Sequence, residues 1–554
     1  MRGIHAIPKW SFVITACIAI GHIDFSSVMA QSGAQSSRQP SNSEDPIAKA
    51  GNWTLEVTLK PASSNALVNT PRQYVPATVR LGDQLWTNVG VRLKGKGSFQ
   101  PIDLKPCLAL KWDAFAPYAV TQGLTKVYFH NGGQDRSMLR EFLGASILQD
   151  AGYPAARVSH ARVSFNGRDL GYYALIEAMN KPFLRRVFGN DSGNLYEGDL
   201  KDIDSLLEQD NGKVKDQTDL QHLCAIARIP DPTERWRRLP EILDVERFID
   251  FLAVGRLMGH NDSYAGRRNN YRIYHDPGTD KMVFLHHSLK STFRQADTSS
   301  LTPLTHSIVT KAVLQTSPGR KRYRDRLGQL FTNVYRVEVL TNRVQEALSR
   351  LLAESKSPEE ATLLKLEAGK LCDIVSADAR HIARELAQPD LAAPRFNTNG
   401  TFAVTGWQST EATNVFLGQV RLDGRDSLHV RIVGSERASA AAWRTRVVLE
   451  PGKYRFSGRC RTAGVEVEET KSGMGAGLFV TLRPGTRGRY AGSEWKELST
   501  QVEVKDGPQE VWLQCELRAT NGEAWFEASS LQLVKAKEQA PQRAPLENES
   551  AEER

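Results

Sequence analysis

The stretch RLKGKGSF, residues 92–99, ends a run of alternating apolar residues and places two glycines among three basic side chains. The alternation predicts a half-buried strand, and glycines at its end would let the backbone approach a phosphate closely. Lys105 and Lys111 follow on the next predicted strand, from which a lysine can neutralise phosphate charge. A glycine pair on its own is more often a hairpin turn, so this stretch indicates a phosphate site only in combination with other signals.

Strand patterns dominate the first part of the chain. Period-two alternation covers residues 53–112. Two further strands, 161–165 and 172–176, flank Asn166-Gly167, the strongest short signal for a hairpin turn.

Helical patterns dominate the part that follows. One helix is predicted from Met138 to a stop at Gly152, and others from about residue 244, over roughly 328–353 and over 358–387. A strand-rich part followed by a helical part suggests two lobes with a cleft between them.

Polar clusters accompany these elements. Glu141 follows Arg140 in the predicted helix, where its carboxylate could fix a strand lysine, although a solvated charge pair is the commoner arrangement. Asp262 and Asn270 lie eight residues apart, which could pair a base with an oxygen ligand for a hard cation, but such residues also fill ordinary loops.

The order of these clusters resembles the spore-coat CotH kinase family. The motifs that carry the resemblance are Gly95-Lys96-Gly97-Ser98-Phe99, Lys105-Pro106, Met138-Leu139-Arg140-Glu141, Asn166-Gly167 through Gly171-Tyr172-Tyr173 to Glu177, Asn194-Leu195-Tyr196-Glu197-Gly198-Asp199 and Asn269-Asn270-Tyr271-Arg272-Ile273-Tyr274. The resemblance covers about residues 53–390. It implies a divergent, two-lobed protein-kinase-like fold that transfers the γ-phosphoryl of ATP to protein serines, with Mg²⁺ or Mn²⁺ as the metal.

The resemblance also implies roles for individual residues. Glu141 would orient the phosphate-binding lysine, which would be Lys105 rather than Lys111. Asp262 would be the catalytic residue that accepts the substrate hydroxyl proton, and Asn270 would hold a metal ion. The full set of nucleotide-binding positions implied in this way is Lys96, Ser98, Lys105, Lys111, Glu141 and Glu177.

One position departs from the family. CotH-like kinases usually end the strand after Asn270 with a metal-binding aspartate, whereas this chain reads His287-Ser288-Leu289-Lys290. A lysine there would repel a divalent metal, so the simpler inference is impaired catalysis in a pseudokinase. Alternatively, Lys290 could sit against a phosphate and replace one metal ion.

The remainder of the chain changes character after Pro389 and Pro394. Short alternating strands separated by turns predict an antiparallel β-sandwich, or jelly roll, over residues 395–535. Cys460 and Cys515 both fall on apolar strand faces, where a disulfide could join the sheets.

The tryptophans of this predicted sandwich could stack on sugars or fill its core. Trp443 falls on the same strand face as its apolar neighbours and is predicted to lie in the core. Trp512 falls on the face opposite the apolar one and is the best candidate for an exposed position.

The ends of the chain point to export. Residues 1–30 have the charge, apolar run and small-residue site of a secretory signal, with an uncleaved anchor as the alternative. Residues 31–47 are predicted to be a flexible leader and 536–554 a disordered tail. The formal charge of +9 is mild for 554 residues and forms no long basic block, which argues against nucleic acid as a partner.

These observations predict an exported α+β protein with a CotH kinase-like domain at 48–390 and a sandwich at 395–535. It would be secreted, periplasmic or at the cell surface, with no membrane span once the signal is removed. The predicted function is ATP-dependent phosphorylation of an exported or surface protein, or a degenerate form of that activity. The alternative is a non-catalytic scaffold whose sandwich binds a glycan or a protein surface.

Overall fold

The computed structural model describes residues 52–536 except 116–124, 214, 297–299, 304–305, 389–390, 392, 411–413, 435–438, 466–473, 481–488 and 506–507. The predicted signal peptide, leader and tail lie outside these residues, apart from Ala536. No described helix combines the length and the apolar character needed to cross a bilayer.

The strand-rich first part closes into a barrel. Its strands, in spatial order, are β1 (Asn52–Thr58), β2 (Val75–Leu81), β3 (Gln84–Lys94), β4 (Cys107–Lys111), β5 (Lys126–His130), β7 (Arg168–Glu177) and β6 (Val158–Phe165), and α1 (Pro61–Asn69) follows β1. Parallel pairing of β1 with β6 closes the ring. The alternating apolar residues fill its interior, among them Val89, Val91 and Leu93, which are at most 1% exposed.

The predicted hairpin between β6 and β7 is confirmed. Asn166 and Gly167 both have positive φ, 49° and 78°, as the two-residue turn between twisted strands requires. The predicted helix at Met138 is also present as α2 (Arg140–Asp150), and the chain leaves it through Gly152 at φ 68°.

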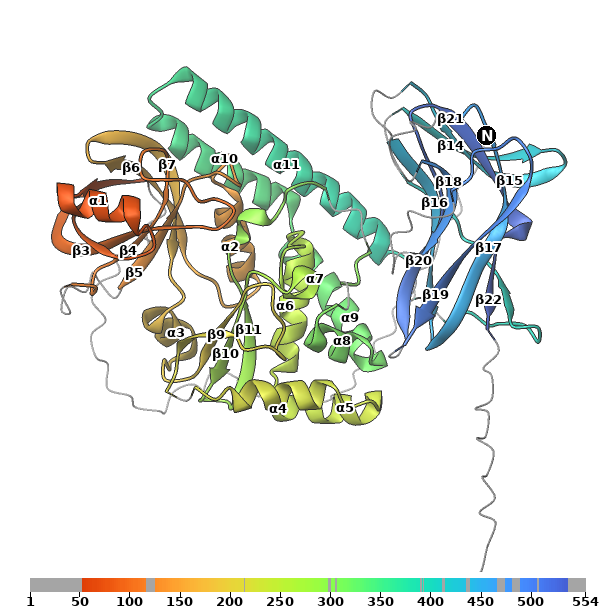
Figure 1. Cartoon of the computed structure of the whole chain (residues 1–554), viewed down its shortest axis with the longest axis horizontal. Coiled ribbons are helices and arrows are strands. Elements are labelled where there is room, and N and C mark those ends of the chain that lie inside the picture. The colour runs from red at the N-terminus through yellow and green to blue at the C-terminus, as the bar shows by residue number, and fades with distance from the viewer. Residues whose placement is uncertain are drawn as a thin grey trace, which may run out of the picture. The chain divides into compact units, whose positions relative to one another are not determined.

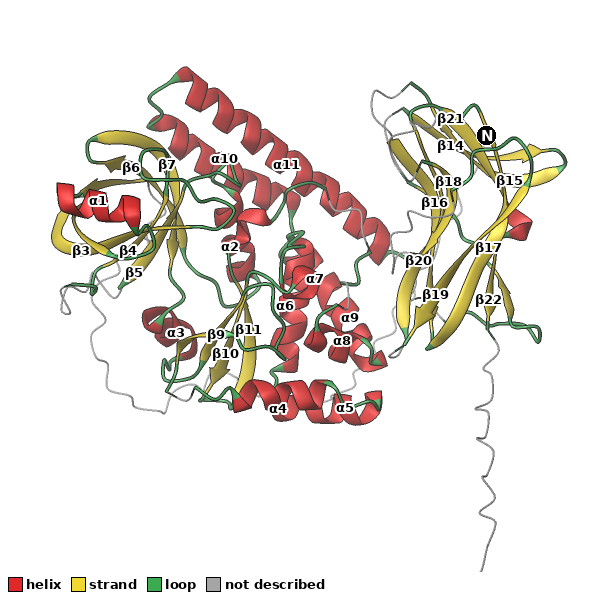
Figure 2. Ribbon diagram, viewed as in Figure 1, coloured by secondary structure: helices red, strands yellow, loops and turns green. Residues whose placement is uncertain are grey.

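Helices and a small sheet form the part of the chain that follows the barrel, and Figure 2 shows them as red helices beside yellow strands. The sheet has the order β11 (Lys281–His286), β10 (Tyr271–Asp276), β8 (Leu195–Gly198) and β9 (Glu208–Asn211). The helices are α3 (Lys181–Phe188), α4 (Thr218–Ala227), α5 (Pro232–Arg238), α6 (Val245–Leu257), α7 (Tyr264–Arg267), α8 (Ile308–Leu314), α9 (Ser317–Asn333), α10 (Val337–Ala353) and α11 (Pro358–Leu386), with short 3₁₀ turns η1 (Leu239–Glu241) and η2 (Leu289–Ser291). One apolar core joins α2 and α6 to the inner face of this sheet.

The single helix predicted over 328–353 is wrong. The chain breaks between α9 and α10, where Val334 and Tyr335 turn into the core and are 7% and 2% exposed. Burying these two side chains is more favourable than continuing a helix that would carry them along its surface. The helix predicted over 358–387 is confirmed as α11.

The last part contains strands almost exclusively (Figure 1). One sheet has the order β12 (Thr401–Ala403), β22 (Gln532–Lys535), β17 (Gly452–Ala463), β21 (Gly522–Glu527), β15 (Arg425–Ile432) and β14 (Val415–Leu422), with β19 (Lys496–Val504) also paired to β17. The other has the order β13 (Gln408–Ser409), β16 (Ser439–Leu449), β20 (Gln509–Ala519) and β18 (Gly475–Val480); the short turn η3 (Ala528–Ser530) precedes β22. Residues of both sheets share one core, which is the arrangement of a sandwich.

Two expectations about this sandwich are corrected. Cys460 and Cys515 are buried in the shared core, but both are free thiols, and burial raises the pKa of each. The prediction that Trp512 is exposed is wrong, since it is 6% exposed. Arg444 and Arg446 of the neighbouring strand cover its ring at 4.4 and 5.4 Å, because long arginine side chains can lie along an outward-facing indole. Trp443 is core, as predicted.

Candidate functional site

The first turn of α2 brings a glutamate into the interior. The segment before the helix is fixed by Asp135, whose carboxylate accepts a hydrogen bond from the Arg140 amide at 2.9 Å. Met138 adopts φ 62° at the bend that leads into the helix. Glu141 then faces inward and is only 3% exposed.

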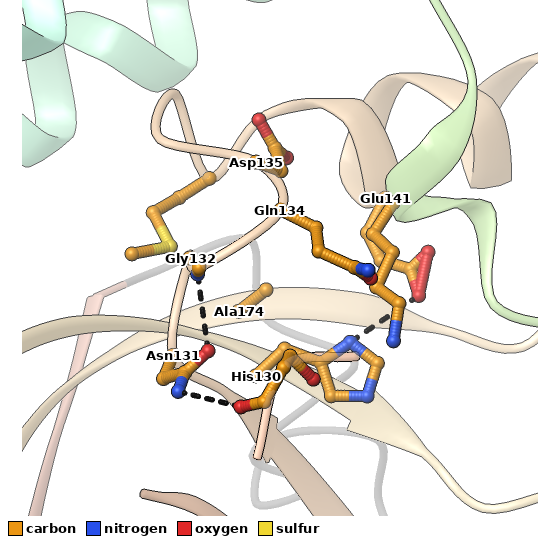
Figure 3. A pocket seen from close by; sticks show the side chains of 11 residues that line it. His130, Asn131, Gly132, Gln134, Asp135, Glu141 and Ala174 are labelled. Carbon is orange, nitrogen blue, oxygen red and sulfur yellow. Dashed lines mark hydrogen bonds and ion pairs between the residues drawn. The ribbon is translucent and has the colours of Figure 1, made fainter. Parts of the chain in front are cut away.

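Glu141 lies among basic groups yet makes little direct contact with them. Its Oε1 is 3.5 Å from Nδ1 of His130, the contact drawn as a dashed line in Figure 3, and burial holds the pKa of this imidazole well below its usual value. Its Oε2 is buried without a hydrogen-bond partner among the described residues. Burial raises the pKa of Glu141 to about 7, while the positive charges of Lys290 and Lys94 act in the opposite direction.

Lys94 is the strand lysine of this cluster. It ends β3 opposite Cys107, and its Nζ lies 3.1 Å from Nε2 of His130 and 3.7 Å from the centroid of the Tyr128 ring. Burial, followed by repulsion from Lys290, lowers the pKa of Lys94 to about 7. The arrangement is that of a lysine and a helix glutamate facing the same space from two different elements.

The structure does not bring Lys105 or Lys111 to Glu141. Lys105 lies 5.1 Å from the Tyr173 ring, and burial lowers its pKa to about 8 despite the attraction of Glu360. Lys111 sits at the opposite end of β4, 3.8 Å from Asp113. The predicted pairing of Lys105 with Glu141 therefore does not occur, because the register of β3 against β4 gives that place to Lys94.

The other glycine-stretch residues also have partners of their own. Lys96 forms an ion pair with Asp199, which follows β8. Ser98 is buried, and its carbonyl accepts a hydrogen bond from the Asn131 side chain at 3.1 Å. Its hydroxyl lies 3.5 Å from the Cys107 sulfur, so Ser98 mainly ties the glycine stretch to β4 and to the loop after β5.

Glu177, at the end of β7, is 2% exposed and fully engaged. Arg157 donates to it from its backbone amide and its guanidinium at 3.0 and 2.9 Å. Arg186 of α3 donates two more hydrogen bonds, at 3.3 and 2.6 Å. This carboxylate joins the barrel to α3 and has no oxygen left over for a ligand.

Asp262 and Asn270 lie in direct contact, while their roles as base and metal ligand stay predictions. The Asn270 side-chain amide donates to Oδ2 of Asp262 at 2.8 Å and to its backbone carbonyl at 3.0 Å. Asn269 donates to Oδ1 at 3.2 Å. Asn270 is held at φ 46° and its carbonyl accepts a hydrogen bond from the His287 amide, which links this pair to the segment that carries Lys290.

Lys290 lies in the 3₁₀ turn after β11, beyond Ser288 at φ 58°. It lines a pocket with Glu141 and with the loop that follows β5; the other lining residues are Ser98, His130, Asn131, Gly132, Gly133, Gln134, Asp135, Met138 and Ala174 (Figure 3). Across the described part of the chain, no side chain is within hydrogen-bonding or ion-pairing distance of the Lys290 ammonium.

A second cavity adjoins this pocket and shares His130 and Glu141 with it. Lys94 and His287 contribute its polar side, and its apolar lining includes Ala156, Val158, Ile176 and Met179. The cavity therefore runs from apolar walls to the basic cluster.

Sequence reasoning missed Lys94 and His130. Lys94 lies within the stretch singled out at the start. Because successive side chains of a strand point to opposite faces, Lys94 points away from the side of Leu93 and thus out of the barrel. His130 carries no comparable signal, since it ends an otherwise apolar strand.

A lysine from a barrel strand thus faces a glutamate from the adjoining helix, next to a cavity. The model of the family described as CotH kinase protein matches residues 91–363 of the chain. No curated protein matches the chain.

Among solved structures, the Helicobacter pylori proinflammatory kinase CtkA matches with 12% identity, over 53% of this chain and 96% of that one, at a TM-score of 0.25. The CBM22-1 xylan-binding domain of Paenibacillus barcinonensis Xyn10C matches with 14% identity, over 27% and 100% of the two chains, at a TM-score of 0.18.

Proposed function

We propose that the CotH-like domain is a two-lobed kinase fold that no longer carries out metal-dependent phosphotransfer. The observation that supports this most directly is the position of Lys290. It shares a pocket with Glu141 and is close enough to Lys94 to lower the pKa of that amine. A cation stands at the place where the family resemblance calls for a metal-binding aspartate.

The residues around this place do not fit a divalent metal ion. Each carboxylate oxygen of Asp262 accepts a hydrogen bond from a side-chain amide, and Asn270 turns its amide hydrogens toward that carboxylate. Among the described residues, no group of three or more His, Cys, Asp or Glu side chains is arranged to hold a metal ion. Two ammonium groups nearby would repel Mg²⁺ further.

The test is a phosphotransfer assay that needs no known acceptor. The chain from residue 31 is incubated with γ-labelled ATP and Mg²⁺ or Mn²⁺, and label in the protein and in free phosphate is measured. We expect no transfer above background, and the same result for Asp262→Ala. Metal-dependent transfer that Asp262→Ala abolishes would contradict the proposal.

Lys290→Asp sharpens this test. If the metal site alone is damaged, this substitution should produce metal-dependent labelling that the parent chain lacks. Absence of any gain, in a variant with unchanged thermal unfolding, would mean that the loss of activity has another cause.

Within this proposal the protein is exported and acts on, or together with, a protein at the cell surface. The predicted signal at residues 1–30 supports export. ATP would be its nucleotide, and no role for nucleic acid is proposed because the chain lacks a basic block.

A second candidate function is glycan binding by the sandwich. Aromatic residues on its larger sheet favour this function, whereas the buried Trp512 does not. On the outer face of that sheet, Trp525 lies parallel to His429 with ring centroids 5.0 Å apart, and Phe416 beside them is 59% exposed. Retardation of the chain in gels that contain a soluble polysaccharide, lost in Trp525→Ala, would support it. Equal mobility with and without every polysaccharide tested would contradict it.

A further inference from the structure

We infer that the pocket of Lys290 and the adjoining cavity of Lys94 bind the polyphosphate of a nucleotide without a divalent metal, with the Lys290 ammonium supplying the positive charge that a metal ion would otherwise provide. This inference rests on the proposed loss of the metal site and adds how the nucleotide is held without a metal.

The first step is the charge balance of the cluster. Lys94 and Lys290 are close enough to repel each other, and Glu141 is the buried carboxylate that both face. Glu197 also attracts Lys94, but Glu197 is already paired with the buried guanidinium of Arg272. The cluster thus has more cationic than anionic groups and is suited to an anion.

The second step is the availability of Lys290. Its ammonium has no hydrogen-bond or ion-pair partner within the described part of the chain, although it is only half exposed and lines the pocket of Figure 3. A lysine on an open surface would be satisfied by water alone. A half-buried lysine beside another lysine is stabilised by an anion that both can contact.

The third step is the shape of the space on either side. The pocket of Lys290 and the cavity of Lys94 lie on either side of His130 and Glu141, which line both. The far wall of the cavity is apolar, with Val158, Ile176 and Met179. A ligand that contacts both the basic cluster and this apolar wall needs a flat apolar part and an anionic tail, and a nucleoside di- or triphosphate has this combination.

The fourth step concerns the metal. A nucleotide bound in other kinases brings Mg²⁺ to neutralise its phosphates. Here the fixed cations already do so, and an added divalent ion would approach two ammonium groups. Metal-free nucleotide is therefore expected to bind more tightly than its Mg²⁺ complex.

The test is calorimetric titration of the chain from residue 31 with ATP, ADP, adenosine and inorganic tripolyphosphate, in EDTA and in Mg²⁺. We expect ATP and ADP to bind in EDTA, Mg²⁺ to weaken them, and adenosine and tripolyphosphate to bind less well than ATP. Lys290→Met should weaken ATP in EDTA by about tenfold or more, the loss of one hydrogen bond to a charged group.

Lys281→Met is the matched control, because Lys281 is a partly exposed lysine at the other end of β11 whose ammonium donates to the Glu241 carbonyl. It should leave ATP binding unchanged. Thermal unfolding of both variants shows whether they fold like the parent chain.

The outcomes separate this inference from the proposed function. Binding of ATP only in Mg²⁺, or no binding in either condition, would overturn the inference and leave the absence of phosphotransfer standing. Tripolyphosphate that binds as tightly as ATP would also overturn it, because the apolar cavity would then play no part. Labelling of the parent chain by γ-labelled ATP would overturn the proposed function itself.

Discussion

Glu141 and Glu177 are two buried glutamates of the same domain with opposite surroundings. Glu177 is 2% exposed and accepts four hydrogen bonds from Arg157 and Arg186. Glu141 is 3% exposed, lies 3.5 Å from His130, accepts a hydrogen bond from the Leu289 backbone, and leaves one oxygen without a partner among the described residues. The family resemblance gave both residues a place at the nucleotide, yet only one is free to take it.

The difference shows how a structural carboxylate is told from a functional one. A buried charge that is fully paired contributes to the fold, and removing it leaves its partners uncompensated. A buried charge that lacks partners costs stability, and proteins retain such groups most often at functional sites. The contrast between the two glutamates can be tested by substituting each of them in turn.

The largest effect is expected for Glu177→Ala. The substitution removes four hydrogen bonds and leaves two guanidinium groups without their carboxylate, so we expect a loss of about 3 kcal/mol in the free energy of unfolding. Urea denaturation followed by tryptophan fluorescence measures it. Glu246→Ala is the control, since Glu246 is 67% exposed in its pair with Arg322 and should change stability by about 0.5 kcal/mol or less. A Glu177 variant as stable as this control would contradict a structural role.

Glu141→Gln should have a smaller effect, and one that depends on pH. The pKa of Glu141 is about 7 in the folded protein, whereas an unperturbed glutamate has a pKa of 4.5. Between these two pH values the carboxyl group of Glu141 is therefore ionised in the unfolded chain and protonated in the folded one. The parent chain therefore loses stability as pH rises from 4.5 to 7, by about 2 kcal/mol, and the glutamine variant does not.

Denaturation of both proteins at pH 5 and pH 7 tests this prediction. Groups away from this cluster titrate equally in the two proteins, so the difference between them reports on Glu141 together with Lys94, whose pKa the Glu141 carboxylate raises. The variant should match the parent chain near pH 5 and be the more stable of the two near pH 7. A difference that does not change with pH would mean that Glu141 is ionised throughout this range.

Local sequence signals predicted most of the fold of this domain. The alternation before Gly95 and the Asn166-Gly167 turn were sufficient for the strands and the hairpin, because strand period and turn chemistry act over a few residues. The break between α9 and α10 was not predictable in this way. It follows from the burial of Val334 and Tyr335 in a core assembled from distant helices.

The site was predicted in part, for a related reason. Glu141, Asp262, Asn270 and Lys290 were found from motif order, but the lysine that faces Glu141 was not. Lys94, Lys105 and Lys111 all lie on or beside neighbouring strands, and the choice among them depends on the register of β3 against β4 and on the position of α2. Neither is encoded within a few residues of any of the three.

The smallest effect is expected for Lys96→Ala. This substitution extends the comparison from the two glutamates to the lysines Lys94 and Lys96. Lys96 lies two residues from Lys94, but its side chain is 80% exposed and pairs with Asp199 in solvent. Exposed pairs contribute little, so stability should change by about 0.5 kcal/mol or less. ATP titration in EDTA should show the same contrast, with Lys94→Met weakening binding and Lys96→Ala leaving it nearly unchanged. If Lys96→Ala weakened ATP as much as Lys94→Met, the glycine stretch itself would hold the phosphates, and the buried cluster would not be the principal anion site.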